Sequence, residues 1–362
     1  MSCFITQTGS FLPGPPVANH EIETYLGKLR DESQVKQLVL RMNGILGRHY
    51  AQTPLQQATH DVYDLAQLAA SDCLLKCGEL PDLSFLAAGT TYAPFTGPGI
   101  ASRLHDRLSR AKLVNQAIEI SSHAGICTSA AAALVGAIRA VASGEHSIAL
   151  SVGSEHASEI LKSSAIELIE DRHEFSDVRK SQWFMSIFLR FMLSDGSGAF
   201  LLESRPRANQ LSLRVDWTHS RSYAHRLPVC MQLETRSARL TQDVAILARH
   251  LAPAGREFLA ESLLAHQETL DHYDVILPHL SSFYFRRKFE QILQENTTPT
   301  GRPVGYWTNL GAVGNTGAAS IYIMLDHYLK THEVSPGTRF LLFIPESGQF
   351  NFVMLSLTAV AS

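Results

Sequence analysis

The sequence predicts an α/β fold made of two similar halves, and three observations support it. Short apolar runs typical of buried strands alternate with longer segments of helical periodicity along the 362 residues. This strand–helix plan occurs twice, although little sequence identity links the two occurrences. Hydrophobic residues make up 45% of the chain, enough to fill a sizeable core. We therefore expect two fused halves, residues 1–205 and 206–362.

The first half is predicted to contain an alternation of buried strands and helices. Its strand candidates are residues 83–88, 117–120, 148–152 and 199–202. The helix after Cys127 carries apolar residues on most of its faces, which is typical of a helix buried on all sides. Residues 156–192 break the alternation and are rich in aromatic residues and Met. The halves are expected to meet near residues 204–209, where the segment RPRAN interrupts the apolar pattern.

The second half repeats this organisation. Its predicted strands are residues 211–217, 274–277, 339–344 and 352–357. Its predicted helices are residues 241–264, 281–293 and 315–329. Because helices lie between several of the strands, we again expect a largely buried sheet.

Composition excludes several classes of function. Charged residues are 18% of the chain and the net charge is −3, so no global field favours nucleic acid or an anionic membrane. The N-terminus has no signal-peptide pattern and no segment approaches the roughly 20 apolar residues that span a bilayer, which predicts a cytoplasmic protein. Five cysteines, an odd number, indicate reduced thiols. Cys73 and Cys77 lie one helical turn apart without a His/Cys cluster nearby, so we expect no metal site.

Cys127 is the first candidate for a reactive residue. It lies where a strand-like segment ends and the alanine-rich helix begins. Unpaired N–H groups and the helix dipole stabilise an anion there, which predicts a thiol pKa below the usual ~8.5. An unpaired Cys in an apolar stretch can also be a small core residue, and position alone leaves both interpretations open.

Two distant segments favour the reactive interpretation. His279 follows the apolar run 275–277 and a proline, and Asn315 lies among three glycines at the start of a predicted helix. Each alone is also compatible with a structural role, as a hydrogen-bonded His or a turn Asn. A thiol, an imidazole and an amide at the heads of strand–helix units together suit acyl-thioester chemistry.

The three segments, in this order, resemble the β-ketoacyl-acyl-carrier-protein synthase III branch of the thiolase-like condensing enzymes. The similarity also covers MNGILGRHYA, SIALSVGSEHASE, SDGSGAFLLES and RFLLFIPESGQFNFVMLSL. It implies a five-layered α-β-α-β-α thiolase-like fold and a homodimer. The implied activity is a Claisen condensation of two acyl thioesters without a metal or other cofactor.

The resemblance also implies roles for particular residues. Cys127 would accept the acyl group, and His279 and Asn315 would donate hydrogen bonds to the thioester oxygen of the second substrate. The oxyanion hole would consist of the backbone N–H groups of Cys127 and Gly348, although a single glycine replaces the triple-glycine pattern of the family. Glu155 would be an auxiliary acid or base, or a carboxylate that caps the following helix. For His123 we expect a packed, hydrogen-bonded role.

Partners follow from the same resemblance. The substrates would be acyl-carrier-protein or coenzyme A thioesters. Residues 26–44 lack the Trp of the family's coenzyme A clamp, which favours the carrier protein. Arg286, Arg287 and Lys288 would dock that acidic carrier, unless they form an ordinary solvated face. Residues 156–192 would cap the acyl channel and contribute to the dimer contact, or form an ordinary packed excursion.

Within the family, the LPGPPVANHEIETYL and PESGQF segments resemble relatives from specialised metabolism, including those that form cyclohexanedione precursors of dialkylresorcinols. Three other functions stay open. The chain could pass its Cys-bound acyl group to an alcohol or amine, although simple acyl transfer does not need Asn315. It could be a non-catalytic partner subunit of a heteromeric synthase, which the intact Cys, His and Asn set disfavours. It could also be a cysteine hydrolase on an unrelated fold.

Overall fold

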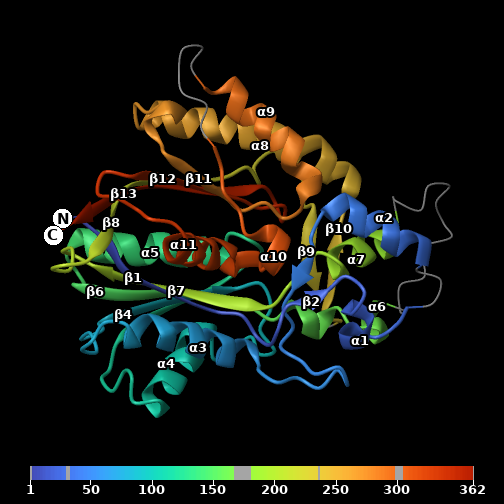
Figure 1. Cartoon of the computed structure of the whole chain (residues 1–362), viewed down its shortest axis with the longest axis horizontal. Coiled ribbons are helices and arrows are strands. Elements are labelled where there is room, and N and C mark those ends of the chain that lie inside the picture. The colour runs from blue at the N-terminus through green and yellow to red at the C-terminus, as the bar shows by residue number, and fades with distance from the viewer. Residues whose placement is uncertain (1, 30–32, 167–180, 235–236, 298–304, 362) are drawn as a thin grey trace.

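The computed structural model describes residues 2–29, 33–166, 181–234, 237–297 and 305–361. Figure 1 shows five layers from bottom to top, which are helices, strands, central helices, a second layer of strands and further helices. The five-layered α-β-α-β-α arrangement expected from the sequence is therefore confirmed.

Nine strands within the described ranges form one hydrogen-bonded sheet in the order β11-β12-β13-β8-β1-β7-β6-β4-β5. Their bounds are β1 Phe4–Phe11, β4 Phe85–Thr90, β5 Glu119–Ala124, β6 Ile148–Glu155, β7 Gly196–Glu203, β8 Leu211–Ser222, β11 Val275–Pro278, β12 Arg339–Pro345 and β13 Asn351–Ala361. The two layers of strands join through a short β1–β8 contact, where Phe4 and Ile5 pair with Arg214 and Leu213.

The helices of the layers are α3 and α4 on one outer side, α5 and α11 in the centre, and α8 and α9 on the other outer side (Figure 1). Their bounds are Val62–Leu75, Ile100–Arg110, Ser129–Ser143, Ser320–Thr331, Val244–Ala265 and Arg286–Glu295. The remaining elements of more than three residues are α1 Ile22–Leu26, α2 Ser33–Asn43, α6 Ser163–Ile166, α7 Gln182–Arg190, α10 Leu310–Val313, the 3₁₀ helix Ala157–Ile160 and the hairpin of β9 Met231–Glu234 and β10 Arg239–Gln242. Short strands β2 Val17–Ala18 and β3 Gly47–Arg48 pair with each other.

The side chains of β12 show how one strand belongs to two layers. Phe340 and Leu342 pack into the central cluster around α5 and α11. Leu341 and Phe343, which alternate with them, pack into the outer cluster that contains residues of α8 and α9. Because successive side chains of a strand point to opposite faces, the continuous apolar run of β12 fills both faces of a fully buried strand.

Two glycines bring the start of α5 against the first layer of strands. A Cβ atom on Gly89 of β4 would lie 2.5 Å from the Ala130 nitrogen, and one on Gly153 of β6 would lie 2.8 Å from the Ala130 Cβ. Only residues without a side chain allow so close an approach. The position of α5, and of Cys127 just before it, is therefore fixed by the sheet.

The predicted strands and helices agree with the structure except at several boundaries. The helix expected at 241–264 begins only at Val244, because residues 239–242 form β10. The Asp243 side chain caps the helix by accepting the Ile246 N–H at 2.9 Å. Strand β1 and the β9–β10 hairpin were not expected. No helix in the described ranges is long and apolar enough to cross a membrane. The division into halves at residues 205 and 206 stays a prediction.

Candidate active site

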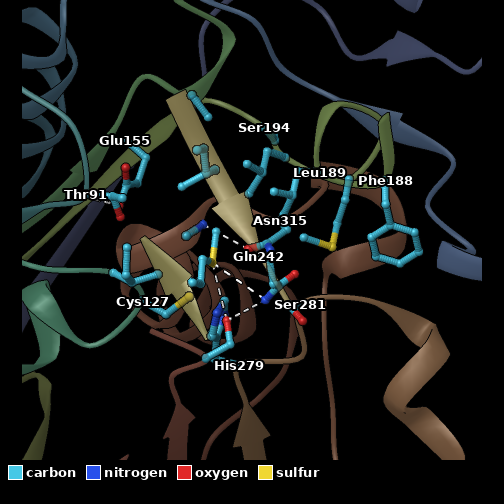
Figure 2. Close-up of a pocket in the computed structure, with 18 of the residues that line it drawn as sticks. Thr91, Cys127, Glu155, Phe188, Leu189, Ser194, Gln242, His279, Ser281 and Asn315 are labelled. Carbon is cyan, nitrogen blue, oxygen red and sulfur yellow. Dashed lines mark hydrogen bonds between the residues drawn. The ribbon is translucent and has the colours of Figure 1, made fainter. Parts of the chain in front are cut away.

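One cavity, of about 850 Å³ including space open to solvent, contains Cys127, His279 and Asn315 in its wall. These residues come from three distant segments, before α5, after β11 and before α11, and Figure 2 shows their side chains grouped around one space. Its other lining residues are Thr91, Tyr92, Ile126, Glu155, Ala157, Ile160, Phe188, Leu189, Met192, Leu193, Ser194, Met231, Leu240, Gln242, Leu247, Leu251, Ser281, Phe285, Gly317, Pro345 and Ser347. The wall is mostly apolar, so the few polar groups in it define where polar chemistry can occur.

Cys127 directly precedes Thr128, the N-cap of α5, as the sequence predicts. The expected low thiol pKa is wrong. Burial raises the pKa of Cys127 well above its usual value, and the carboxyl groups of Glu346 and Glu155 raise it further. The N–H of Thr128, which would otherwise face an anion at this helix end, instead donates to Glu346 at 3.1 Å. The thiol is therefore the resting form at neutral pH.

His279 lies immediately after β11, and its backbone N–H donates to the Phe343 carbonyl at 2.8 Å. The imidazole is buried, and neither ring nitrogen has a hydrogen-bond partner in the described part of the chain. Burial lowers the pKa of His279 to about 4. The ring is thus neutral at neutral pH, with one N–H to donate and one nitrogen to accept. Because both ring nitrogens are unpaired and the residue lies in the cavity wall, the imidazole can form hydrogen bonds with a molecule bound there.

Asn315 is held by both its backbone and its side chain. Its backbone N–H donates to the Met192 carbonyl at 3.1 Å, and its backbone carbonyl accepts the Ser194 N–H at 2.8 Å. Its side-chain oxygen accepts the Gly317 N–H at 2.9 Å. Because the Gly317 N–H fixes which terminal atom of the amide is the oxygen, the other terminal atom is the NH₂ nitrogen. Asn315 lies in the cavity wall, where this NH₂ group can donate to a ligand.

Glu155 is buried at the end of β6 and also lines the cavity. Its Oε1 accepts three hydrogen bonds, from the Thr91 N–H at 3.0 Å, the Thr91 hydroxyl at 2.6 Å and the Ala318 N–H at 3.1 Å. Its Oε2 has no partner among the described residues. Burial raises the pKa of Glu155 to about 7. The carboxyl group does not cap the 3₁₀ helix that follows, which has no side-chain cap.

Gly348 is not among the residues that line the cavity, whereas its neighbour Ser347 is. The carbonyl of Gly348 accepts the N–H groups of Cys230 and Met231 at 2.8 and 3.1 Å. A Cβ at this position would lie 2.7 Å from Glu346 Oε1 and 3.0 Å from the Ile126 side chain. The loop therefore packs against the segment that contains Ile126 and Cys127, and its oxyanion role stays a prediction.

Two further parts of the cavity wall come from the 156–192 segment and from the region of the β9–β10 hairpin. The described portion of the 156–192 segment lines the cavity through α7 and adjoining residues, while residues 167–180 lie outside the described residues. The β9–β10 hairpin, whose strand β10 packs against α7, and the start of α8 also line the cavity, and the hairpin was not expected from the sequence. The alternation of apolar and polar residues in MQLE and the short polar segment TRS that follows it are the signal that could have indicated this hairpin.

The proposed docking residues and His123 lie outside the cavity. Arg286, Arg287 and Lys288 are exposed at the start of α9, and Arg286 donates to Glu290 at 2.8 Å. Phe285, the residue before them, lines the cavity, so this basic segment begins beside the cavity wall. His123 on β5 forms a 2.9 Å hydrogen bond with the Ser121 hydroxyl, as expected.

Solved structures share this architecture over the full chain. AbyA1, a tetronic acid condensing enzyme, aligns over 98% of this chain and 99% of its own, with 21% identity and a TM-score of 0.78. This chain has a thiolase-like fold. The 3-oxoacyl-(acyl carrier protein) synthase III FabH of Pseudomonas aeruginosa PAO1 aligns over 100% of the chain and 99% of its own, with 19% identity and a TM-score of 0.74.

OleA of Xanthomonas campestris, solved with lauric acid and lauroyl-CoA, covers 99% of both chains, with 17% identity and a TM-score of 0.78. No protein-family model matches the sequence. At these identities the similarity establishes the thiolase-like fold, and function has to be argued from the site itself.

Proposed function

We propose that this protein is a ketosynthase that forms a carbon–carbon bond by Claisen condensation of two acyl thioesters. The observation that carries the proposal is the joint presence of Cys127, His279 and Asn315 in the wall of one apolar cavity. A nucleophile and two neutral hydrogen-bond donors are what this reaction requires. Further support comes from solved structures with the same fold, which include a tetronic acid condensing enzyme and a 3-oxoacyl-(acyl carrier protein) synthase III.

In the first half-reaction Cys127 receives the acyl group. Its sulfur attacks the thioester carbonyl carbon, the bond from that carbon to the donor sulfur breaks, and the donor thiol leaves with the proton that Cys127 gives up. Because burial and two carboxyl groups raise the pKa of Cys127, this proton must move during the attack. The acyl group is then held as a thioester of Cys127.

In the second half-reaction His279 and Asn315 act on the other thioester. The neutral imidazole N–H and the amide NH₂ donate to its carbonyl oxygen, where negative charge develops as the α-carbon becomes a carbanion. This carbanion attacks the Cys127 thioester, the carbon–sulfur bond breaks, and Cys127 is released. The product is a β-ketoacyl thioester.

Glu155 is proposed as the auxiliary base of a condensation that starts from an acyl or β-ketoacyl thioester. Its Oε1 is fixed by Thr91 and Ala318, while its Oε2 is unpaired among the described residues in the cavity wall. A pKa of about 7 suits a group that takes a proton at neutral pH. With a malonyl thioester, loss of CO₂ would generate the carbanion without this base.

The cavity favours an aliphatic acyl chain. Leucine, methionine and phenylalanine side chains of α7, the β9–β10 hairpin and α8 line one part of it, and Ile126, Ile160, Met192, Leu193 and Phe285 add to its apolar surface. Burial of each methylene there contributes about 0.8 kcal/mol to binding. A cyclohexanedione precursor of dialkylresorcinols, formed from a β-ketoacyl partner, stays the predicted product.

Two partners are proposed. An acidic carrier protein would dock on the exposed Arg287 and Lys288, which lie close in sequence to the cavity-lining Phe285. A second copy of the chain would pair with β5, the strand at one edge of the sheet, which exposes Ile120 at 40% of its surface. An exposed apolar sheet edge is a typical site of strand pairing between chains.

The proposal is tested by intact-protein mass spectrometry with a panel of acyl-carrier-protein and acyl-coenzyme A thioesters, with Cys127→Ala as control. We expect a Cys127-dependent acyl adduct that disappears, with formation of a new carbon–carbon bond, when a malonyl or β-ketoacyl thioester is added. Release of the acyl group only onto an alcohol, amine or water would indicate acyl transfer or hydrolysis. Absence of an adduct with every donor would indicate a non-catalytic partner subunit.

A further inference from the structure

Two buried glutamates occupy equivalent places in the thiolase-like fold. Glu155 ends β6, which pairs parallel with β4 and antiparallel with β7. Glu346 follows β12, which pairs parallel with β11 and antiparallel with β13. Each carboxyl group crosses between the two layers of strands. The one on β6 reaches the start of α11, and the one after β12 reaches the start of α5. Glu155 accepts from Ala318, just before α11, and Glu346 accepts from Thr128, just before α5.

Glu346 connects the loop after β12 to the nucleophile segment. Its Oε2 accepts both the N–H of Thr128, at 3.1 Å, and the Thr128 hydroxyl. Its Oε1 accepts the Asn351 side-chain N–H at 2.8 Å, and its backbone N–H donates to the Asn351 carbonyl at 2.8 Å. The carboxylate is buried, so these bonds are shielded from water and strong. It is therefore a clamp between residue 128 and residue 351.

The clamp holds two backbone N–H groups that donate to no carbonyl and to no side chain of another residue in the described part of the chain. They belong to Cys127, next to Thr128, and to Gly348, two residues after Glu346. The loop is also held from behind, because the Gly348 carbonyl accepts the N–H groups of Cys230 and Met231. Two such N–H groups on segments joined by one side chain are suited to bind a single oxygen atom.

We propose that Glu346 is a positioning residue that sets the oxyanion hole of the acyl-transfer step by clamping the Gly348 loop to the start of α5. This inference rests on the proposed function, because it assumes that Cys127 accepts an acyl group. Glu346 has a second consequence for the same segment. Its negative charge opposes formation of the Cys127 thiolate, so the clamp improves acyl transfer while it makes the free thiol less reactive.

Two reactions of Cys127 separate these effects. Acylation by p-nitrophenyl hexanoate passes through a tetrahedral oxyanion and needs the hole, whereas alkylation by iodoacetamide needs only the thiolate. Both are followed in the full-length protein, with Cys127→Ala to subtract background. Glu346→Ala removes the clamp and the charge, and Glu346→Gln removes the charge but keeps an oxygen that can accept from Thr128.

For Glu346→Ala we expect the acylation rate at saturating ester to fall about 10²-fold with little change in KM. The pH midpoint of alkylation is expected to move to lower pH in both variants, with a much smaller loss of acylation in Glu346→Gln. Thr128→Val, which removes only one donor to the clamp, is expected to slow acylation about tenfold and provides a test if Glu346→Ala does not fold. Glu261→Gln, on the surface of α8, is the control for loss of a carboxylate.

Equal losses of acylation and alkylation in the clamp variants would overturn the inference, because they would indicate general damage to the fold. Unchanged acylation in Glu346→Ala or in Thr128→Val would overturn it as well. Failure of the proposed function looks different. In that case the wild-type protein would form the hexanoyl adduct but would make no carbon–carbon bond with any second thioester.

Discussion

Glu155 and Glu346 have the same relation to the sheet but different surroundings. Comparing them distinguishes a carboxylate that holds structure in place from one that can exchange a proton. Both oxygens of Glu346 accept hydrogen bonds, and the side chain does not line the cavity. Glu155 has one oxygen with three donors and one without a partner among the described residues, and it does line the cavity. A carboxylate with both oxygens engaged can hold structure in place. A carboxylate with one free oxygen can also exchange a proton with a ligand.

The largest expected effect distinguishes the steps that the two glutamates serve. Glu155→Gln keeps an oxygen for the three donors but cannot take a proton, so we expect condensation from a non-malonyl thioester to slow by about 10²- to 10⁴-fold. Acylation of Cys127 should change little, the opposite of Glu346→Ala. Single-turnover mixing of acylated enzyme with the second thioester measures this step. A loss confined to acylation would contradict the distinction between the two residues.

The donors that face the cavity come next in size. We expect His279→Ala and Asn315→Ala each to slow condensation by about 10²- to 10³-fold, because each removes one donor to the developing enolate. Acylation should be much less affected, since it uses the other oxyanion site. The same single-turnover assay, with acylation measured separately by mass, gives both rates. If both variants lost acylation instead, these residues would belong with Glu346 to the first step.

A third prediction concerns stability against pH. The folded-state pKa of Glu155, about 7, lies above its ordinary value of 4.5, so the folded protein binds a proton that the unfolded chain has released. Stability from this group is therefore present below about pH 4.5 and lost as pH rises to about 7. Relative to wild type, Glu155→Gln should gain up to about 3 kcal/mol between pH 5 and 8. Urea unfolding at both pH values tests this, and an equal difference at both would contradict it.

The smallest expected effects come from the glycines beside each glutamate. A Cβ on Gly348 would lie 2.7 Å from Glu346 Oε1, and one on Gly317 would lie 3.1 Å from Glu155 Oε1 with a backbone φ of +52°. We expect Gly348→Ala to destabilise by about 1–3 kcal/mol and to slow acylation, because it displaces the clamp. Gly317→Ala should cost about 1–2 kcal/mol and affect condensation instead. Thermal melts and the two rate assays test this for both variants. Slower condensation in Gly348→Ala, or slower acylation in Gly317→Ala, would contradict the prediction.

The layers could be predicted from the sequence because the burial of a strand or helix determines its local pattern of apolar residues. The continuous apolar run of β12 and the apolar faces of α5 identified elements that are covered on all sides. Glycine spacing and the resemblance together identified Asn315. Boundaries were harder to predict. Residues 241 and 242 were expected to begin a helix, but they belong to β10 because they pair with β9.

Electrostatics could not be predicted from local sequence. A helix N-terminus suggested a low pKa for Cys127, but the result depends on Glu346, which lies more than two hundred residues away in the chain, and on burial by the folded protein. Similarly, Glu155 was expected to cap its own following helix or to be a base, and its contacts with Thr91 and Ala318 are tertiary. Charges act through space, so their partners become known only when the fold brings them together.

Part of the cavity wall is formed by the β9–β10 hairpin and the first turns of α8, while Cys127 and Asn315 lie at the starts of the central helices α5 and α11. Substitutions in the hairpin can thus alter the length and shape of the chain that is accommodated without moving the atoms that react. Substrate preference can therefore change through the hairpin and α8, while the chemistry is retained by the residues at the central helices. A protein designer could exchange Leu240 or Leu247 for larger or smaller residues and expect a different selectivity from the same catalyst.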